Sequence, residues 1–427
     1  TAANDGMVHI FKKNGGSDER SYNLKLSYIP GTMPRQDFDN DTSALKDSTL
    51  AQELRTFAEK GYVGDRYGVD GGFVLRQVNL NGQDRVFMFG AMGLGGRGAY
   101  ALDLSKINEN YPAAAPLFDV KNGDKNGKNG KNGKNRVEVE LGYTVGTPQI
   151  GKTQNGKYAA FLASGYAAKQ IASQENKTAL YVYDLNNTLG TPIAKIEVKD
   201  GKGGLSSPTL VDKDLDGIVD IAYAGDRGGN MYRFDLSDND PNKWTVRTIF
   251  QGTKPITSAP AVSRLADKRV VIFGTGSDLS EQDVLDMKEQ YIYGIFDDDT
   301  EAGNVKVDGK GLGVGLLEQV LKEENKTLFL NKGSDGSGSK GWVVKLKEGQ
   351  RVTVKPTVVL RTAFVTIRSY TGTDKCGAQT AILGINTADG GALTPRSARP
   401  IVPEANKDVA QYSGHKKTAG GKSVPIG

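Results

Sequence analysis

The stretch DIAYAGDRGGNMYRFDLS (residues 220–237) decides the fold class of this chain. It contains two short runs of apolar and aromatic residues, which pleated strands favour. The runs flank Gly225, Gly228 and Gly229, and glycines can adopt the positive φ angles that tight hairpins need. The stretch therefore predicts a β-hairpin whose second strand ends at an aspartate.

Versions of this pattern recur along the chain, and most pair a short apolar strand with an aromatic one. The other copies are NDGMVHIF (4–11), RVFMFGAMGLGGRGAYALDLS (85–105), YAAFLASGY with ALYVYDLN (158–166, 179–186), RVVIFGTGS with QYIYGIFDD (269–277, 290–298), KGWVVKL (340–346), and AFVTIRSY with AILGINTADGG (363–370, 381–391). Their spacing is roughly 50–65 residues, the length of four strands with loops, which indicates propeller blades. We therefore predict an all-β, seven-bladed β-propeller that forms a single domain over residues 1–427. An array of β-sandwiches is the alternative.

Two segments have the spacing of short helices inserted between strands. In DSTLAQELRTFAEKG (47–61), Leu50, Leu54 and Phe57 recur on one helical face. The second segment is SEQDVLDMKEQ (280–290). Residues suited to capping stand at their ends: Thr49 with Gln52, Gly61 and Ser280. We expect both helices to pack against the propeller wall.

The net charge of +5 comes from one low-complexity tract. KNGDKNGKNGKNGKNR (121–136) has six basic residues and one acidic residue, so its charge is 6 − 1 = +5. A repeated Lys-Asn-Gly unit has no apolar surface to bury, and it predicts a flexible, solvated loop, with a polyanion-binding patch as the alternative. Because the rest of the chain is balanced in charge, we expect no nucleic-acid partner.

Residue types that often carry chemistry are few. Cys376 is the single cysteine, so no disulfide can form within the chain, and a lone thiol is typically a small buried hydrophobic residue. His9 and His415 lie near opposite ends of the sequence, which argues against a multi-histidine metal centre. No apolar run approaches the roughly 18 residues of a membrane span. The chain begins at Thr1, and we expect a soluble part of a longer or processed protein.

The segment DKDLDGIVD (212–220) holds four aspartates, whose mutual repulsion requires a counter-charge. With Asp212 as position 1, aspartates and Gly217 follow the ligand order of an EF-hand loop, in which position 7 contributes a backbone carbonyl. Five residues are the predicted calcium ligands: Asp212, Asp214, Asp216, the carbonyl of Ile218, and Asp220. Calcium suits such a flexible, oxygen-rich loop better than magnesium.

The loop differs from an EF-hand in its surroundings. Position 12 is Tyr223 instead of a bidentate Glu, and the flanking residues have strand patterns instead of helical ones. The alternative is a turn whose aspartates only cap backbone amides. A second acidic group, Asp37, Asp39 and Asp41, lacks the Gly at position 6 and precedes a helix, so we expect a solvated or helix-capping role there.

Segments along nearly the whole chain resemble, in order, the C-terminal propeller domain of the PilC/PilY family of type IV pilus tip-associated adhesins. They are ANDGMVHIF (3–11), SYIPGTMPR (27–35), GVDGG (68–72), GGRGAYALDLS (95–105), GLSSPTLVDKDLDGIVDIAYAGDRGGNMYRFDLS (204–237), ITSAPAV (256–262), FGTGSDL (273–279), QYIYGI (290–295) and GWVVKLKEGQRV (341–352). The resemblance implies a modified, quinoprotein-like propeller with short helical insertions and a calcium site in one blade, formed by the ligands named above.

The resemblance also implies a role in pilus biogenesis, in extension against retraction, in twitching motility and in host-cell adhesion. The implied partners are pilins or minor pilins and a host-cell receptor, and the implied location is the bacterial surface, at the pilus tip or outer membrane. No catalytic site can be assembled from the residues, so we predict that the protein is not an enzyme. Two alternatives share the fold: an integrin-like or lectin-like propeller, which predicts similar loops in several blades, and a quinoprotein dehydrogenase.

Overall fold

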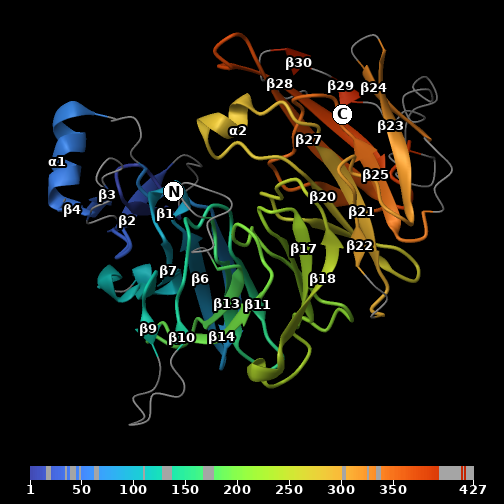
Figure 1. The fold of residues 1–427 in the computed structure, drawn as a ribbon. Helices are drawn as coiled ribbons and strands as arrows, with labels where there is room; N and C mark the ends of the chain where they lie inside the picture. Colours follow the sequence, from blue (N-terminus) through green and yellow to red (C-terminus); the bar gives the residue numbers. More distant parts are fainter. Residues whose placement is uncertain are drawn as a thin grey trace. The chain divides into compact units, whose positions relative to one another are not determined.

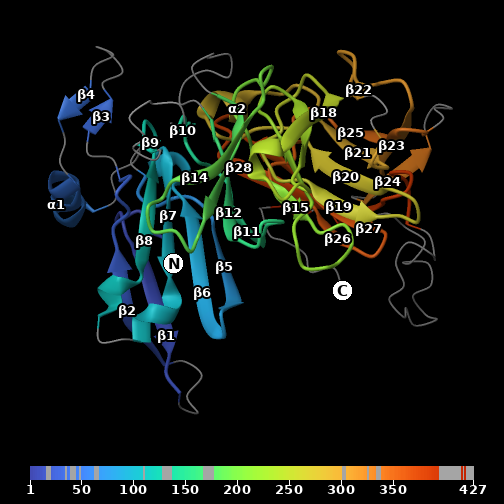
Figure 2. The same cartoon turned by 90° about the horizontal axis from the view of Figure 1, so that it is seen from below.

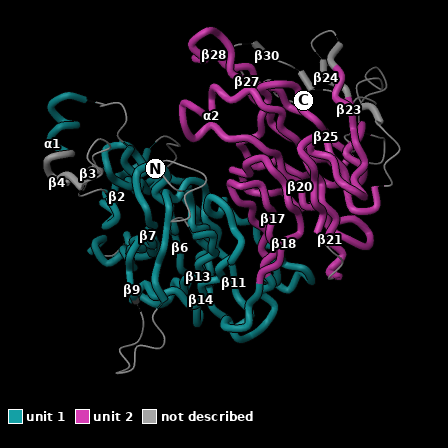
Figure 3. Tube along the Cα trace, in the orientation of Figure 1, with its two compact units in different colours: residues 1–221, 235–245 teal, residues 222–234, 246–427 magenta. Residues whose placement is uncertain are grey.

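The computed structural model describes a chain dominated by strands (Figure 1). The described residues are 1–15, 21–33, 36–38, 45–47, 50–61, 67–108, 111–126, 137–166, 177–300, 304–324, 327–332, 338–393, 415–416 and 418–419. The chain divides into two compact units, which comprise residues 1–221 with 235–245, and residues 222–234 with 246–427 (Figure 3). Among the residues described, neither α-helix is long and apolar enough to cross a lipid bilayer.

Unit 1 is built around two four-stranded antiparallel sheets, ordered β5-β6-β7-β8 and β11-β12-β13-β14. Figure 2 shows the strands of the first sheet side by side. The elements of the unit are β1 (Val8–Lys13), β2 (Tyr22–Tyr28), β3 (Gln36–Phe38), β4 (Leu45–Asp47), α1 (Leu50–Lys60), β5 (Phe73–Leu80), β6 (Gln83–Ala91), β7 (Gly98–Asp103), β8 (Pro116–Lys121), β9 (Lys125–Asn126), β10 (Val137–Glu138), β11 (Gln149–Lys152), β12 (Tyr158–Ala163), β13 (Ala179–Asp184), β14 (Pro192–Glu197), β15 (Thr209–Val211), and the 3₁₀ turns η1 (Gly93–Gly95), η2 (Leu104–Asn108), η3 (Pro112–Ala114) and η4 (Pro241–Lys243).

The two four-stranded sheets of unit 1 pack against each other through aromatic side chains. The ring centroids of Phe89 and Tyr183 lie 6.1 Å apart, and those of Phe118 and Tyr183 lie 5.9 Å apart. Every residue of the inner strands β7 and β13 is buried. Strands that are buried on both faces have continuous apolar runs instead of alternation, which explains the unbroken hydrophobic runs of the sequence repeats.

In unit 2, β16, β17, β18 and β22 follow one another in one sheet, and β19, β20, β21 and β25 follow one another in a second. The second sheet continues through β23, β24 and β29, and a third has the order β26-β27-β28-β30. Elements wholly or mostly in this unit are β16 (Ile221–Gly225), β17 (Asn230–Asp235), β18 (Thr245–Gln251), β19 (Ala261–Arg264), β20 (Arg269–Gly274), α2 (Glu281–Leu285), β21 (Tyr291–Asp297), β22 (Val305–Lys306), β23 (Leu316–Glu324), β24 (Thr327–Lys332), β25 (Gly341–Lys345), β26 (Thr357–Val359), β27 (Thr362–Thr371), β28 (Gly377–Asn386), β29 (His415–Lys416) and β30 (Thr418–Ala419).

Glycines that face large aromatic residues recur in both units. Gly90 of β6 is paired with Tyr100 of β7, and a Cβ at Gly90 would lie 2.1 Å from the ring carbon Cζ. Gly294 of β21 is paired with Trp342 of β25, and a Cβ there would lie 2.1 Å from the ring carbon Cε2. Each ring lies across its glycine in space that any other side chain would need. These glycines are therefore required by packing and not by a turn.

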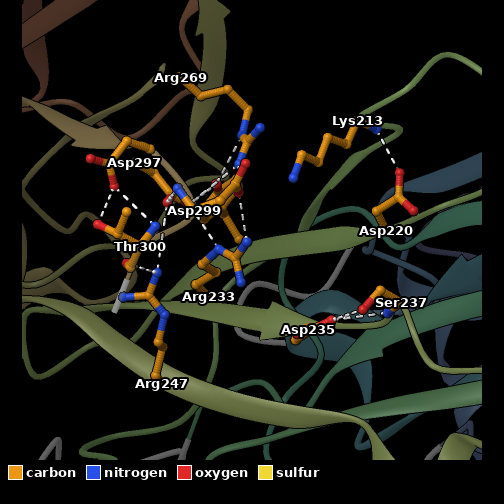
Figure 4. Close-up of polar contacts among 12 residues, drawn as sticks. Lys213, Asp220, Arg233, Asp235, Ser237, Arg247, Arg269, Asp297, Asp299 and Thr300 are labelled. Atoms are coloured by element: carbon orange, nitrogen blue, oxygen red, sulfur yellow. Dashed lines mark hydrogen bonds and ion pairs between the residues drawn. The ribbon is translucent and has the colours of Figure 1, made fainter. Parts of the chain in front are cut away.

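A buried charge cluster joins two sheets within unit 2 (Figure 4). Asp297, at the end of β21, accepts hydrogen bonds from Nε of Arg233 in β17, at 2.8 Å, and from the hydroxyl of Tyr223 in β16. Asp299 accepts from Nη2 of Arg233 at 2.8 Å and also pairs with Arg269 of β20. Burial, followed by the neighbouring Asp297, raises the pKa of Tyr223 well above its usual range, so the phenol stays a donor.

The strand repeats predicted from the sequence are confirmed. The opening stretch forms β16 and β17, and Gly229 between them has a φ of 111°. Gly225 has a different role from the predicted one, because it lies within β16, where a Cβ would meet Cγ2 of Ile256 at 2.5 Å. The all-β class is therefore confirmed, while the number of blades stays a prediction.

Both predicted helices are present, but less of each is helical or buried than expected. In α1, Leu54 packs against a buried cluster of unit 1, whereas Phe57 on the same predicted face is 39% exposed. Gly61 has a φ of 71° and donates its N–H to the carbonyl of Phe57 at 2.8 Å, as expected of a C-terminal glycine. Thr49, the predicted N-terminal cap, lies outside the described residues.

The second predicted helix, α2, covers only Glu281–Leu285 of the expected 280–290. Ser280 caps it as predicted, because its hydroxyl accepts a hydrogen bond from the N–H of Asp283 at 3.2 Å. The helix ends at Asp286, whose backbone is extended, with φ −71° and ψ 120°.

Cys376 is exposed, which corrects the expectation of a buried thiol. It lies in the turn between the ten-residue strands β27 and β28, where Asp374 accepts its N–H at 3.1 Å. A turn at the end of so long a hairpin lies beyond the buried parts of both strands. The first residues of the Lys-Asn-Gly tract are also structured, since Asn122 accepts the N–H of Leu141 at 2.8 Å, whereas residues 127–136 lie outside the described residues.

The contact between Gly294 and Trp342 gives a test of the packing. We expect Gly294→Ala to lower the free energy of unfolding by roughly 1–3 kcal/mol, because the new methyl group overpacks a buried ring. Gly309→Ala is the matched control, because a Cβ there has no atom within 4 Å. Urea unfolding measures both variants, and equal midpoints would show that the ring does not constrain this position.

Candidate metal centre

The aspartate loop, residues 212–220, belongs to unit 1 and connects β15 to β16. Three of its four carboxylates converge. Oxygens of Asp212, Asp214 and Asp216 all lie within 4.8 Å of one another. Among the described residues, no other group of three or more acidic, histidine or cysteine side chains brings its ligand atoms this close together. The spacing predicted from the sequence therefore brings three of the four aspartates together.

Side-chain to backbone hydrogen bonds curl the loop around these carboxylates. Asp212 accepts the N–H of Asp216 at 3.2 Å and that of Gly217 at 2.7 Å. Asp216 in turn accepts the N–H of Ile218 at 2.8 Å. Gly217 has a φ of 86°, which allows the sharp turn at this point, and Leu215 also adopts a positive φ of 62°. The loop is thus held curled around its carboxylates by its own hydrogen bonds.

Asp220 is placed differently from the other three aspartates. Its carboxylate accepts a hydrogen bond from the backbone N–H of Lys213 at 2.6 Å (Figure 4). It accepts a second hydrogen bond from Nε2 of Gln154 at 2.9 Å. Burial, followed by the charges of the other aspartates, raises the pKa of Asp220, although the Lys213 N–H opposes this effect. In this geometry Asp220 closes the loop, and its predicted role as a ligand at position 9 stays a prediction.

The loop is also tied to a second sheet of unit 1. Ile218 forms a parallel bridge with Lys152 at the end of β11, and the N–H of Val219 donates to the Lys152 carbonyl at 2.8 Å. The contact with Gln154 comes from the turn that follows the same strand. Gln154 could not be identified from the sequence, because it lies 66 residues from its partner Asp220.

The donor set fits a hard divalent cation. Carboxylate oxygens with no sulfur or imidazole ligand suit calcium or magnesium, and an irregular loop with mixed oxygen donors favours the larger ion. The loop has four aspartates and one lysine, so its charge is −4 + 1 = −3, and a divalent cation would lower this to −1. The structure also accounts for the missing ligand at position 12, because Tyr223 is fully buried in β16 and its hydroxyl is bonded to Asp297.

The second acidic group of the sequence lies only partly within the described residues. Asp37 lies in the short strand β3, while Asp39 and Asp41 lie outside the described residues. His9 is bonded through its two ring nitrogens to Asp5 at 2.6 Å and Ser27 at 2.8 Å.

We expect the folded protein to bind one calcium ion, more weakly than about 10⁻⁷ M because the bidentate Glu of an EF-hand is missing. Asp216→Ala removes one of the three converging carboxylates and should weaken binding by roughly 100-fold or more. Asp238→Ala removes an exposed aspartate from another loop of unit 1 and serves as the control. Calorimetry measures both, and equal binding by wild type and Asp216→Ala would exclude this site.

Comparison with known proteins places the loop in a family context. A sequence model of the PilY1 beta-propeller domain matches residues 1–333. The type IV pilus biogenesis factor PilY1 of Pseudomonas aeruginosa is 29% identical over 334 residues, which cover 70% of this chain and 25% of that protein. A PilY1 homologue of Xylella fastidiosa is 26% identical over 415 residues, which cover 92% of this chain and 29% of the homologue. The chain thus spans about a quarter of the length of these curated relatives.

The fold agrees with this match. The crystal structure of the Pseudomonas aeruginosa PilY1 C-terminal domain superposes with a TM-score of 0.67 and 22% identity, over 98% of this chain and 86% of that domain. The β-propeller class and the family resemblance expected from the sequence are confirmed by these matches. With a family match over residues 1–333 and the same fold over nearly its whole length, the chain belongs to the PilY1 β-propeller domain family.

Proposed function

We propose that this chain is the propeller domain of a non-enzymatic type IV pilus biogenesis factor whose loop 212–220 binds calcium. Family membership supports the first part, together with relatives that are named type IV pilus biogenesis factors. The observation that carries the calcium assignment is the convergence of three carboxylates within 4.8 Å. The pilus system implies a location at the bacterial surface, at the pilus tip or outer membrane.

The role of calcium in this proposal follows from the loop's charge. When bound, the ion would neutralise part of the −3 charge of residues 212–220. The loop keeps its curled shape through Asp212 and Asp216, so the main change at the surface is electrostatic. Leu215 stands in the same loop with 77% of its surface exposed, beside the charges that the ion would offset.

A partner that docks on this loop would therefore bind differently with and without calcium. We propose that the partner is a pilin or minor pilin, and that calcium occupancy biases the pilus towards extension over retraction. Twitching motility and adhesion to a host-cell receptor would follow from the number of surface pili. A ligand can shift such a balance only through unequal affinity for the two states, which here comes from the loop's charge.

The alternative of an integrin-like or lectin-like propeller predicts comparable carboxylate groups in several sheets. Within the described part of the chain, one group meets the distance limit, which favours the pilus role. A quinoprotein dehydrogenase gains no support from the family match or from the names of the relatives.

The test places Asp216→Ala in the full-length protein and measures surface pili and twitching motility. We expect fewer pili and less motility, because the loop loses calcium and keeps a repulsive charge. Asp216→Lys adds a fixed positive charge at the same place and should restore part of the piliation.

Asp238→Ala is the matched control and should behave as wild type. If Asp216→Ala loses calcium binding but matches wild type in piliation and motility, the site is only structural and the regulatory proposal is wrong.

A further inference from the structure

Strands β1 and β2 form an antiparallel ribbon (Figure 2). Three of its large apolar side chains are exposed to solvent. The exposed fraction is 50% for Phe11, 57% for Tyr22 and 54% for Leu24. Phe11 is paired with Leu24, and Lys13 is paired with Tyr22. Because side chains two residues apart in a strand share a face, these four lie together on one face of the ribbon.

The apolar part of this face is comparable in area with the largest apolar patch on a typical monomeric protein. Half-exposed aromatic side chains contribute about 100 Å² each, and with the leucine the total is roughly 300 Å². A specific protein interface buries about 800 Å² on each partner, so this face alone is small for a protein partner. A lipid surface needs no matching shape, and a patch of this size can enter it directly.

The charges on the ribbon are basic. Strands β1 and β2 contain Lys12, Lys13 and Lys25 and no acidic residue. All three lysine residues are exposed. Lys25 occupies the bulge, where the register passes from Leu26 directly to Leu24. Aromatic and aliphatic side chains flanked by lysines are the composition of surfaces that bind anionic headgroups.

We propose that this face of the β1–β2 ribbon is a docking surface for an anionic lipid membrane. Phe11 and Leu24 enter the boundary of the acyl chains, and the hydroxyl of Tyr22 stays at headgroup level. The ammonium groups of Lys13 and Lys25 contact headgroup phosphates.

The ribbon lies flat on the membrane, because its exposed apolar side chains share one face of the two strands. Addition of a partner strand along β2 explains less, because it would satisfy main-chain groups and leave the apolar face in water.

The experiment uses the 427-residue chain and sedimentation with lipid vesicles. Wild type should sediment with equimolar phosphatidylglycerol and phosphatidylcholine, but not with phosphatidylcholine alone. The double variant Phe11→Ser with Leu24→Ser should bind on the order of tenfold more weakly. Lys13→Glu with Lys25→Glu should abolish binding, and added salt should weaken the binding of wild type.

Controls separate this effect from general surface changes. Tyr111→Ser with Leu189→Ser removes apolar residues of 76% and 77% exposure elsewhere in unit 1 and should bind as wild type. Phe11→Trp gives a second readout, because Trp244 and Trp342 are both buried and the new indole should shift to shorter emission wavelengths on anionic vesicles.

Several outcomes would overturn the proposal. One is equal binding by wild type and the double serine variant. Another is sedimentation of wild type with pure phosphatidylcholine vesicles. A third is the absence of any emission shift for Phe11→Trp on anionic vesicles. If the protein binds poly-glutamate but not vesicles, and Lys13→Glu with Lys25→Glu abolishes that binding, the ribbon is a site for an acidic protein partner instead. None of these results depends on piliation, so this test and the test of the pilus proposal fail independently.

Discussion

An aromatic ring that lies across a glycine of the neighbouring strand is the contact on which the sheets of this protein depend. Tyr100 covers Gly90 in unit 1, and Trp342 covers Gly294 in unit 2. Because glycine has no side chain, the ring can lie directly against the neighbouring strand. Bulky side chains therefore fit inside sheets whose strands are buried on both faces. Aromatic rings also meet across sheets, as Phe89 and Tyr183 do, and these contacts add stacking to the burial of apolar area.

Sheets packed this closely hold the ends of the loops that join their strands. The N–H of Asp220 donates to Val211 at 2.9 Å, and its carbonyl accepts from Leu236 at 2.8 Å, so the last residue of the aspartate loop is fixed by its backbone. The bond from Val219 to Lys152 adds a second attachment. The three converging carboxylates therefore lie on a loop whose ends are held by backbone hydrogen bonds. A metal site needs side chains that are held in place in this way.

The parts of the structure that the sequence predicted are those set by local spacing. The order Asp212, Asp214, Asp216 around Gly217 is a local pattern, and the loop geometry agrees with it. Gln154 and the pairing of Arg233 with Asp297 could not be predicted, because partners 66 and 64 residues apart meet only through the packing of sheets.

The sequence was misleading where a residue type serves more than one purpose. Gly225 fits a turn by its chemistry, but it lies in a strand to make room for Ile256. Cys376 fits a core by its chemistry, yet it lies at a hairpin end. In each case the residue's neighbours in space, and not its type, determine its role.

The hydrogen bonds within the aspartate loop also decide what kind of signal calcium could give. Asp212 and Asp216 already curl the loop around its carboxylates, so calcium binding would require little change of shape. A small change of shape means that little binding energy is spent on rearrangement. It also means that a partner has little conformational difference to recognise. What remains is the change in charge, from −3 to −1 over residues 212–220. Because screening limits such an effect to about 8 Å at physiological ionic strength, a partner that senses calcium must contact the loop itself.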